Sequence, residues 1–207
     1  MTDHFRLLDE PRQPWLDADA LKTRYLALSS AVHPDRFHTA AAAAQAAANE
    51  RYLAINTAYQ CLRDTRPRLQ HLLELELGAK PAQLQQILPE TMDLFMEVGQ
   101  LCRQVDAFLA EKNAATAPML KVKFFAQGLD WLDRLNALQQ QLGPRRAALE
   151  TELQSLNPAW QAAPSPDAAA VRRAALPLRR LEEIYRLLSY YDRWAGQLQE
   201  RAVQLSL

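Results

Sequence analysis

The residues with the clearest chemical potential are His33 and Asp35, which flank Pro34 between two stretches of helical pattern. A histidine beside a carboxylate could act as an oriented general base if a nucleophile or a metal ion lay within reach. Ser29 and Ser30 precede this group, but they belong to the helical pattern and not to a nucleophile-elbow sequence. The local sequence therefore predicts a displayed turn and no catalytic centre.

A metal site is the second chemistry that these residue types suggest. His33 and His38 would have to converge with Cys61 or His71, and those spacings match no common metal-binding motif. The two cysteines, Cys61 and Cys102, fit buried thiols of a cytoplasmic protein. Glycine-rich phosphate loops are absent from the sequence. We therefore expect neither a metal site nor a cofactor.

Composition narrows the class of protein. The chain has 207 residues, enough for one large or two modest domains. Its 24 basic and 24 acidic residues balance, which argues against a nucleic-acid-binding protein. With only 5 glycines the composition favours helix, so we predict an all-α fold. No apolar run approaches the roughly 20 residues of a membrane span, and the N-terminus lacks a signal pattern, so we expect a cytoplasmic protein without membrane contact.

Two helices are predicted to hold the His-Pro-Asp segment between them. Asp17 is a suitable N-cap for the first helix, and Pro34 should end that helix at His33. Thr39 is expected to cap the second helix. The apolar stripes are Leu21, Tyr25, Leu28 and Val32 in the first helix, and Tyr52, Ile55, Tyr59 and Leu62 in the second. Matching stripes and a short loop predict an antiparallel hairpin.

Other elements surround this hairpin. A short helix is expected from Asp3 to Leu8, and a further helix after Pro67 that stops at Gly78. Residues 79–89 read as a linker, which divides the chain into a first domain over residues 1–78 and a second over residues 90–207.

The second domain is predicted to contain three long helices. The first spans about residues 89–112, and the second starts near Thr116 with that residue as cap. Gly143-Pro144 is expected to kink or split the second helix, and residues 158–169 to form a loose connection. The last helix carries a seam at alternating spacings of 3 and 4, consisting of Leu181, Ile184, Leu188, Tyr191, Ala195, Leu198, Ala202 and Leu205. Such a seam predicts a helical bundle.

The sequence around the His-Pro-Asp segment resembles the J-domain family. Members of that family carry His-Pro-Asp between the second and third helices of a small helical domain. The run from Ile55 to Asp64 is similar to the family's third helix. Arg68, the run from His71 to Leu75 and Gly78 resemble one branch, the HscB-type co-chaperones, which typically have an aromatic residue where His71 stands.

The residues Asp3 to Leu8 are similar to the N-terminus of the same branch, so the resemblance covers residues 3 to 78. It implies docking on a DnaK-type ATPase chaperone and stimulation of its ATP hydrolysis. Basic side chains would steer the domain toward an acidic chaperone surface. The implied contact residues are His33, Pro34, Asp35 and Arg36 in the loop, with Lys22 and Arg24 on the preceding helix. Ser29, Ser30 and Ala31 stand where family members often have a further basic residue.

For the second half, the resemblance implies a three-helix bundle, with the two domains in an L-shaped arrangement. The bundle of HscB-type proteins binds the scaffold protein on which iron–sulfur clusters are assembled. The residues that the resemblance assigns to this patch are Phe95, Met96, Gly99 and Leu187. Leu187 lies off the seam of the last helix and is expected to face outward. At Gly99, Gln100 and Arg103 the chain departs from the family pattern, which has a larger apolar residue and acidic residues there.

Two alternatives stay open beside an HscB-type co-chaperone. The chain could be a J-domain adaptor that delivers a different client through its second half. It could also be a helical interaction protein with a degenerate J-domain that stimulates no ATPase. In all three cases the chain has no active site of its own.

Overall fold

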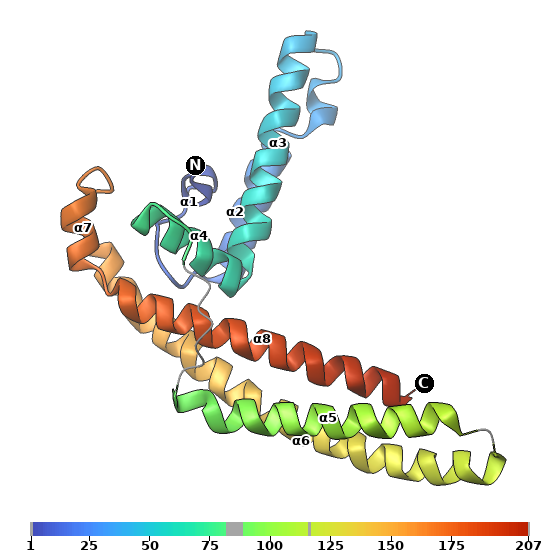
Figure 1. Ribbon diagram of the computed structural model, residues 1–207. Helices are drawn as coiled ribbons and strands as arrows, with labels where there is room; N and C mark the ends of the chain where they lie inside the picture. The colour runs from blue at the N-terminus through green and yellow to red at the C-terminus, as the bar shows by residue number, and fades with distance from the viewer. Residues whose placement is uncertain (1, 82–88, 116, 207) are drawn as a thin grey trace. The chain divides into compact units, whose positions relative to one another are not determined.

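The computed structural model describes residues 2–81, 89–115 and 117–206. These residues form eight α-helices and two short 3-10 helices, and the described part of the chain contains no strand (Figure 1). The all-α prediction is confirmed. No helix of the described ranges is both long and apolar enough to cross a membrane.

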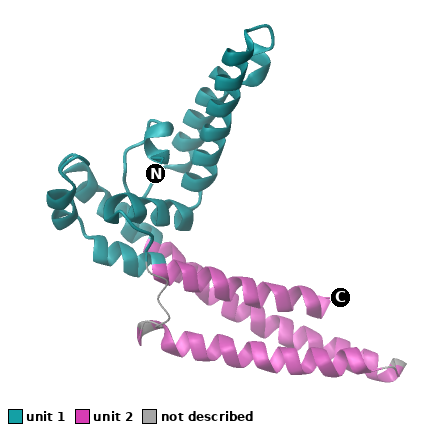
Figure 2. Cartoon of the chain, turned by 45° about the horizontal axis from the view of Figure 1, so that its top comes forward, with its two compact units in different colours: residues 1–82, 150–185 teal, residues 83–149, 186–207 magenta. Residues whose placement is uncertain are grey.

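The helices gather into two compact units, shown in Figure 2. The units consist of residues Met1–Ala82 with Glu150–Tyr185, called unit 1, and of residues Gln83–Leu149 with Arg186–Leu207, called unit 2. Two long helices contribute residues to both units. The domain limits drawn from the sequence stay a prediction, and residues 82–88 of the predicted linker lie outside the described residues.

Unit 1 begins with the predicted helical hairpin and the elements beside it. Its elements up to residue 82 are α1 (His4–Leu7), α2 (Ala18–Ala31), η1 (Pro34–Phe37), α3 (Ala42–Arg63) and α4 (Thr65–Leu77). Two predicted end signals are confirmed. The Asp17 carboxylate accepts a hydrogen bond from the Ala20 amide at 2.7 Å, and Gly78 ends α4 in the left-handed conformation with φ 76°.

The hairpin is held by the two predicted stripes. Leu21, Ile55 and Leu62 are buried between the helices and their neighbours. Tyr25 stacks on Tyr59 with ring centroids 4.1 Å apart, and its hydroxyl donates to Asn56 at 2.8 Å. Each buried aliphatic side chain stabilises the fold by roughly 1.5–3 kcal/mol. The pairing therefore fixes α2 against α3 and places the loop at one end of the hairpin (Figure 1).

The start of α3 differs from the prediction. Thr39 does not cap it, because the helix begins at Ala42 with Ala41 in the N-cap position and no side-chain hydrogen bond there. The 3-10 helix η1 is followed by a turn in which the Ala40 amide donates to the Phe37 carbonyl at 2.9 Å. This turn includes Thr39 and delays the start of the helix.

Residues 150–185 complete unit 1 with a helix that the sequence does not predict, α7 (Ala169–Ala175). Arg172 on α7 and Glu76 on α4 form a buried ion pair, with the Arg172 Nε atom 2.8 Å from a carboxylate oxygen. Arg173 donates to the Glu76 carbonyl at 3.0 Å. Asn157 exchanges hydrogen bonds of 3.0 and 2.9 Å with the Trp15 backbone. These contacts attach residues 150–185 to the first helices of the chain.

Unit 2 is built from three long helices, α5 (Met92–Ala114), α6 (Pro118–Gln161) and α8 (Leu178–Ser206), the last two of which also extend into unit 1. Buried residues of all three fill the core of unit 2, among them Val98, Cys102, Val105, Leu135, Leu138, Leu142, Leu188, Tyr191 and Leu198. Arg201 on α8 donates to the Asp106 carboxylate on α5 at 2.7 Å. The predicted seam of the last helix is thus a core seam.

The helix α6 is longer than predicted. It is not split at Gly143-Pro144, and it ends at Gln161, so the connection after it is shorter than residues 158–169. A proline inside a helix removes one hydrogen bond and clashes with the carbonyl four residues earlier and with the preceding residue. Gly143 relieves the last of these clashes because it has no Cβ atom. Buried leucines on both sides of Pro144, Leu142 and Leu149, keep the helix packed. The predicted Thr116 cap lies outside the described residues.

Candidate functional site

The His-Pro-Asp segment forms the start of η1, between α2 and α3. The Nδ1 atom of His33 accepts a hydrogen bond from the Asp35 amide at 3.3 Å, so His33 caps this short helix. Pro34 occupies the first helical position, where its missing N–H costs nothing. The Asp35 side chain is 89% exposed, with one carboxylate oxygen 3.5 Å from His33 Nδ1. The imidazole thus shapes the bend and the carboxylate faces solvent.

The bend is braced by residues on both sides of it. The His38 Nδ1 atom lies 2.7 Å from the Asp35 carbonyl oxygen, and Arg36 donates to the Ser30 carbonyl at 3.4 Å. The ring of His33 meets the edge of Tyr52 on α3 at a centroid distance of 5.2 Å. A braced loop loses less conformational entropy on docking than a free one.

Ser29 provides no nucleophile for His33. Its side chain is buried, and its hydroxyl donates to the Leu26 carbonyl of its own helix at 3.3 Å. Ser29 is therefore not available as the nucleophile that general-base catalysis by His33 would require.

The basic residues of α2 are exposed but differ in their contacts. Arg24 donates to the Glu10 carboxylate at 3.0 Å, an exposed pair of the kind worth about 0–1 kcal/mol. Lys22 makes no ion pair with any residue that the structure describes. Arg36 is exposed, and its bond to the end of α2 leaves the guanidinium beside the bend. Positive charge therefore lies on the helix that leads to the Asp35 carboxylate.

The residues predicted to bind the scaffold protein differ in their exposure. Phe95 and Met96 on α5 are 38% and 57% exposed, and Met92 beside them is exposed as well. Leu187 is only 3% exposed, so the expectation that it faces outward is wrong. The apolar face of α8 is wider than the seam, since it also includes the buried Trp194, 6.4 Å from Phe95 between ring centroids.

Gly99 continues the surface of Phe95 and Met96 along α5. A Cβ atom at Gly99 would lie 3.5 Å from the Arg103 guanidinium. The structure therefore has a basic side chain beside the position where the family pattern has a larger apolar residue.

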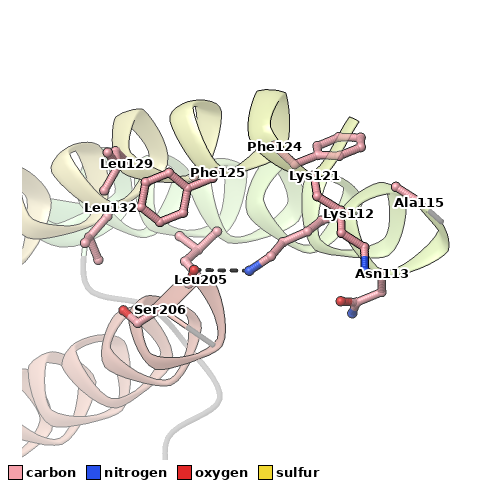
Figure 3. A pocket seen from close by; sticks show the side chains of 11 residues that line it. Lys112, Asn113, Ala115, Lys121, Phe124, Phe125, Leu129, Leu132, Leu205 and Ser206 are labelled. Atoms are coloured by element: carbon pink, nitrogen blue, oxygen red, sulfur yellow. Dashed lines mark hydrogen bonds between the residues drawn. The ribbon is translucent and has the colours of Figure 1, made fainter. Parts of the chain in front are cut away.

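A pocket of about 610 Å³ lies in unit 2, between the facing ends of α5, α6 and α8 (Figure 3). Phe125 and Leu129 are exposed at its wall, and Lys112 donates to the Leu205 carbonyl at 3.2 Å. Its lining is mainly apolar, with no pair of acid and base among the lining residues. It could hold an apolar group, and it offers no catalytic chemistry.

Comparison with known proteins relates the chain to HscB. No family model matches it. It is 44% identical over 80 residues to the co-chaperone protein HscB homolog of Paraburkholderia xenovorans (strain LB400), a match that covers 37% of this chain and 46% of that protein. The matched segment thus spans less than half the length of this curated relative.

Two solved structures resemble the chain. Chaperone HscB from Vibrio cholerae has a TM-score of 0.47 and 25% identity, over 91% of this chain and 99% of that one. Human co-chaperone protein HscB has a TM-score of 0.50 and 18% identity, over 96% of this chain and 81% of that one. The likeness to the human protein concerns the fold. The 44% identity concerns only the matched segment of 80 residues, which resembles an HscB-type co-chaperone.

Proposed function

We propose that this chain is an HscB-type co-chaperone, which docks on a DnaK-type ATPase chaperone through the His-Pro-Asp bend and stimulates ATP hydrolysis there. The observation that supports this most is the exposed Asp35 carboxylate on a braced bend. A carboxylate held in one place is a strong acceptor for a charged donor on a partner. Bracing by His33 and Tyr52 lowers the entropy lost on contact.

Stimulation would arise by coupling, since the chain offers no catalytic group of its own at the bend. Docking stabilises the chaperone state that is competent for hydrolysis, and couplings of this kind are typically about 1–3 kcal/mol. The expected stimulation of ATP hydrolysis is therefore roughly 5–150-fold.

Positive charge on α2 would accelerate docking on an acidic surface. The binding rate to the ATP-bound chaperone should fall as salt is added, and Lys22→Ala should lower that rate and weaken its salt dependence. Lys123→Ala is the matched control, because Lys123 is exposed on α6 in unit 2. Equal effects of the two substitutions would contradict steering by α2.

We infer further that unit 2 carries an iron–sulfur cluster scaffold protein on the α5 surface formed by Met92, Phe95 and Met96. These adjacent apolar side chains are exposed, as expected of a small protein-binding patch. A pull-down with purified scaffold protein tests this. Met96→Asp should abolish capture, and Met119→Asp, an exposed methionine at the start of α6, should leave it intact.

A different client is the second candidate, and the position of the Arg103 guanidinium beside Gly99 favours it. A basic group at that place would suit a partner with an acidic surface. Failure to capture the iron–sulfur scaffold, together with normal stimulation of the ATPase, would support this adaptor function. Loss of both activities would support a helical interaction protein with a degenerate J-domain.

A further inference from the structure

Three potential metal ligands come together in unit 1, away from the His-Pro-Asp bend. His4 lies on α1, Cys61 on α3 and His71 on α4, and their ligand atoms all lie within 4.8 Å of one another. His71 is buried, and the other two are partly buried. The sequence does not predict this group, because the three helices meet only in the folded chain.

We propose that His4, Cys61 and His71 bind a zinc ion. Imidazole nitrogens and a thiolate are the donors that Zn²⁺ takes in proteins, and three protein ligands leave one tetrahedral position for water or an external ligand. Mg²⁺ and Ca²⁺ prefer oxygen donors, which this group lacks. Binding removes the thiol proton of Cys61, which passes to solvent.

The hydrogen bonds of these side chains can be exchanged for bonds to a cation. The Nδ1 atom of His4 is buried and has no hydrogen-bond partner among the described residues. Buried polar atoms without a partner are uncommon, and a bound ligand is one explanation for them. His71 Nε2 accepts a hydrogen bond from the His4 amide at 3.1 Å, so its lone pair points toward α1, and a cation bound to this atom would replace the hydrogen bond. The Cys61 thiol donates to the Pro67 carbonyl at 3.6 Å, a weak contact to give up.

The charged side chains around the group balance, because Arg68 lies near Cys61 as well. Asp3 and Glu74 are close enough to act on the histidine of α4, and Arg12 opposes them. Asp3 and Arg12 are themselves paired at 2.8 Å.

A titration of full-length protein without a polyhistidine tag tests the site. After treatment with a chelator, the protein should bind one Zn²⁺ per chain and melt at a higher temperature. With Co²⁺ as the probe it should show thiolate-to-cobalt charge-transfer absorption. Cys61→Ser and His71→Phe should each weaken binding by at least about tenfold, since even second-shell changes cost 10–100-fold.

Cys102→Ser is the control, because Cys102 is the other thiol and lies in unit 2. It should leave both the stoichiometry and the cobalt spectrum unchanged. The inference is overturned if Cys61→Ser binds Zn²⁺ as tightly as the unaltered protein, or if the charge-transfer band is absent. Circular dichroism checks that the variants are folded. If His71→Phe unfolds, the comparison of Cys61→Ser with Cys102→Ser still decides the outcome.

Discussion

The ion pair of Glu76 and Arg172 gives a quantitative test of how residues 150–185 are attached within unit 1. The two residues are only 6% and 5% exposed. Arg172 donates to the Glu76 carboxylate from Nε at 2.8 and 3.1 Å and from Nη2 at 2.9 Å, and from Nη1 to the Pro164 carbonyl at 2.7 Å. Arg172→Met keeps an unbranched apolar stem, removes the guanidinium and leaves the carboxylate buried without its partner.

Removal of one partner from such a pair costs about 3–5 kcal/mol of unfolding free energy. That is a large share of the 5–15 kcal/mol that stabilises a typical protein. Glu76→Leu should be costly for the same reason, since it leaves the guanidinium buried. The double variant should cost less than the sum of the two single variants, because no unpaired charge is then buried.

Urea unfolding followed by circular dichroism measures the free energies, and hydrogen exchange of α4 and α7 locates the loss. Arg179→Met is the matched control, because Arg179 is 95% exposed beside Glu183 and should cost less than about 1 kcal/mol. The reasoning is refuted if Arg172→Met costs no more than Arg179→Met, or if the effects at Glu76 and Arg172 simply add.

Three further predictions concern single residues. Asp35→Asn should abolish ATPase stimulation and change the unfolding free energy by less than about 0.5 kcal/mol, since the side chain is exposed; a large fall in melting temperature would instead mean a structural cap. The pKa of His71 is 6.5 in the unfolded chain and is lowered to about 4 in the folded chain. As the pH drops from the first value to the second, the unfolded chain protonates His71 before the folded chain does, so the free energy of unfolding falls. By pH 4.5 the free energy of unfolding should be about 2–3 kcal/mol lower than at pH 7.5, as measured by urea unfolding with chelator present. His71→Phe should remove this loss, and an equal pH dependence in that variant would contradict the assignment to His71. Gly196→Ala should stabilise α8 by about 0.5–1 kcal/mol, because nothing lies within contact of the added Cβ atom. Gly143→Ala should stabilise α6 by less, because its Cβ atom would precede Pro144. Equal increases in melting temperature for the two variants would contradict this.

The hairpin could be predicted from the sequence because its signals are local. Asp17 caps a helix through its own next turn, and Gly78 ends one through its own backbone. The His-Pro-Asp bend is likewise set by Pro34 and by the His33 side chain. Each of these signals acts within a few residues, so no tertiary contact is needed to interpret it.

The features that the sequence did not predict depend on distant contacts. The helix α7 places Arg172 beside Glu76, which is 96 residues away in the sequence. Leu187 is buried because the apolar face of α8 is wider than a simple seam. The group of His4, Cys61 and His71 has no periodic spacing to reveal it. Periodicity shows which face of a helix is apolar, but it does not show which other helices that face meets.

Single-turnover ATP hydrolysis by a purified DnaK-type chaperone tests the central claim most directly. The full-length protein is compared with its His33→Gln variant at the same concentration, after both have been shown to have the same melting temperature. The account predicts a rate increase of roughly 5–150-fold with the unaltered protein and little or none with the variant. No increase with the unaltered protein, or the same increase with both proteins, would contradict it.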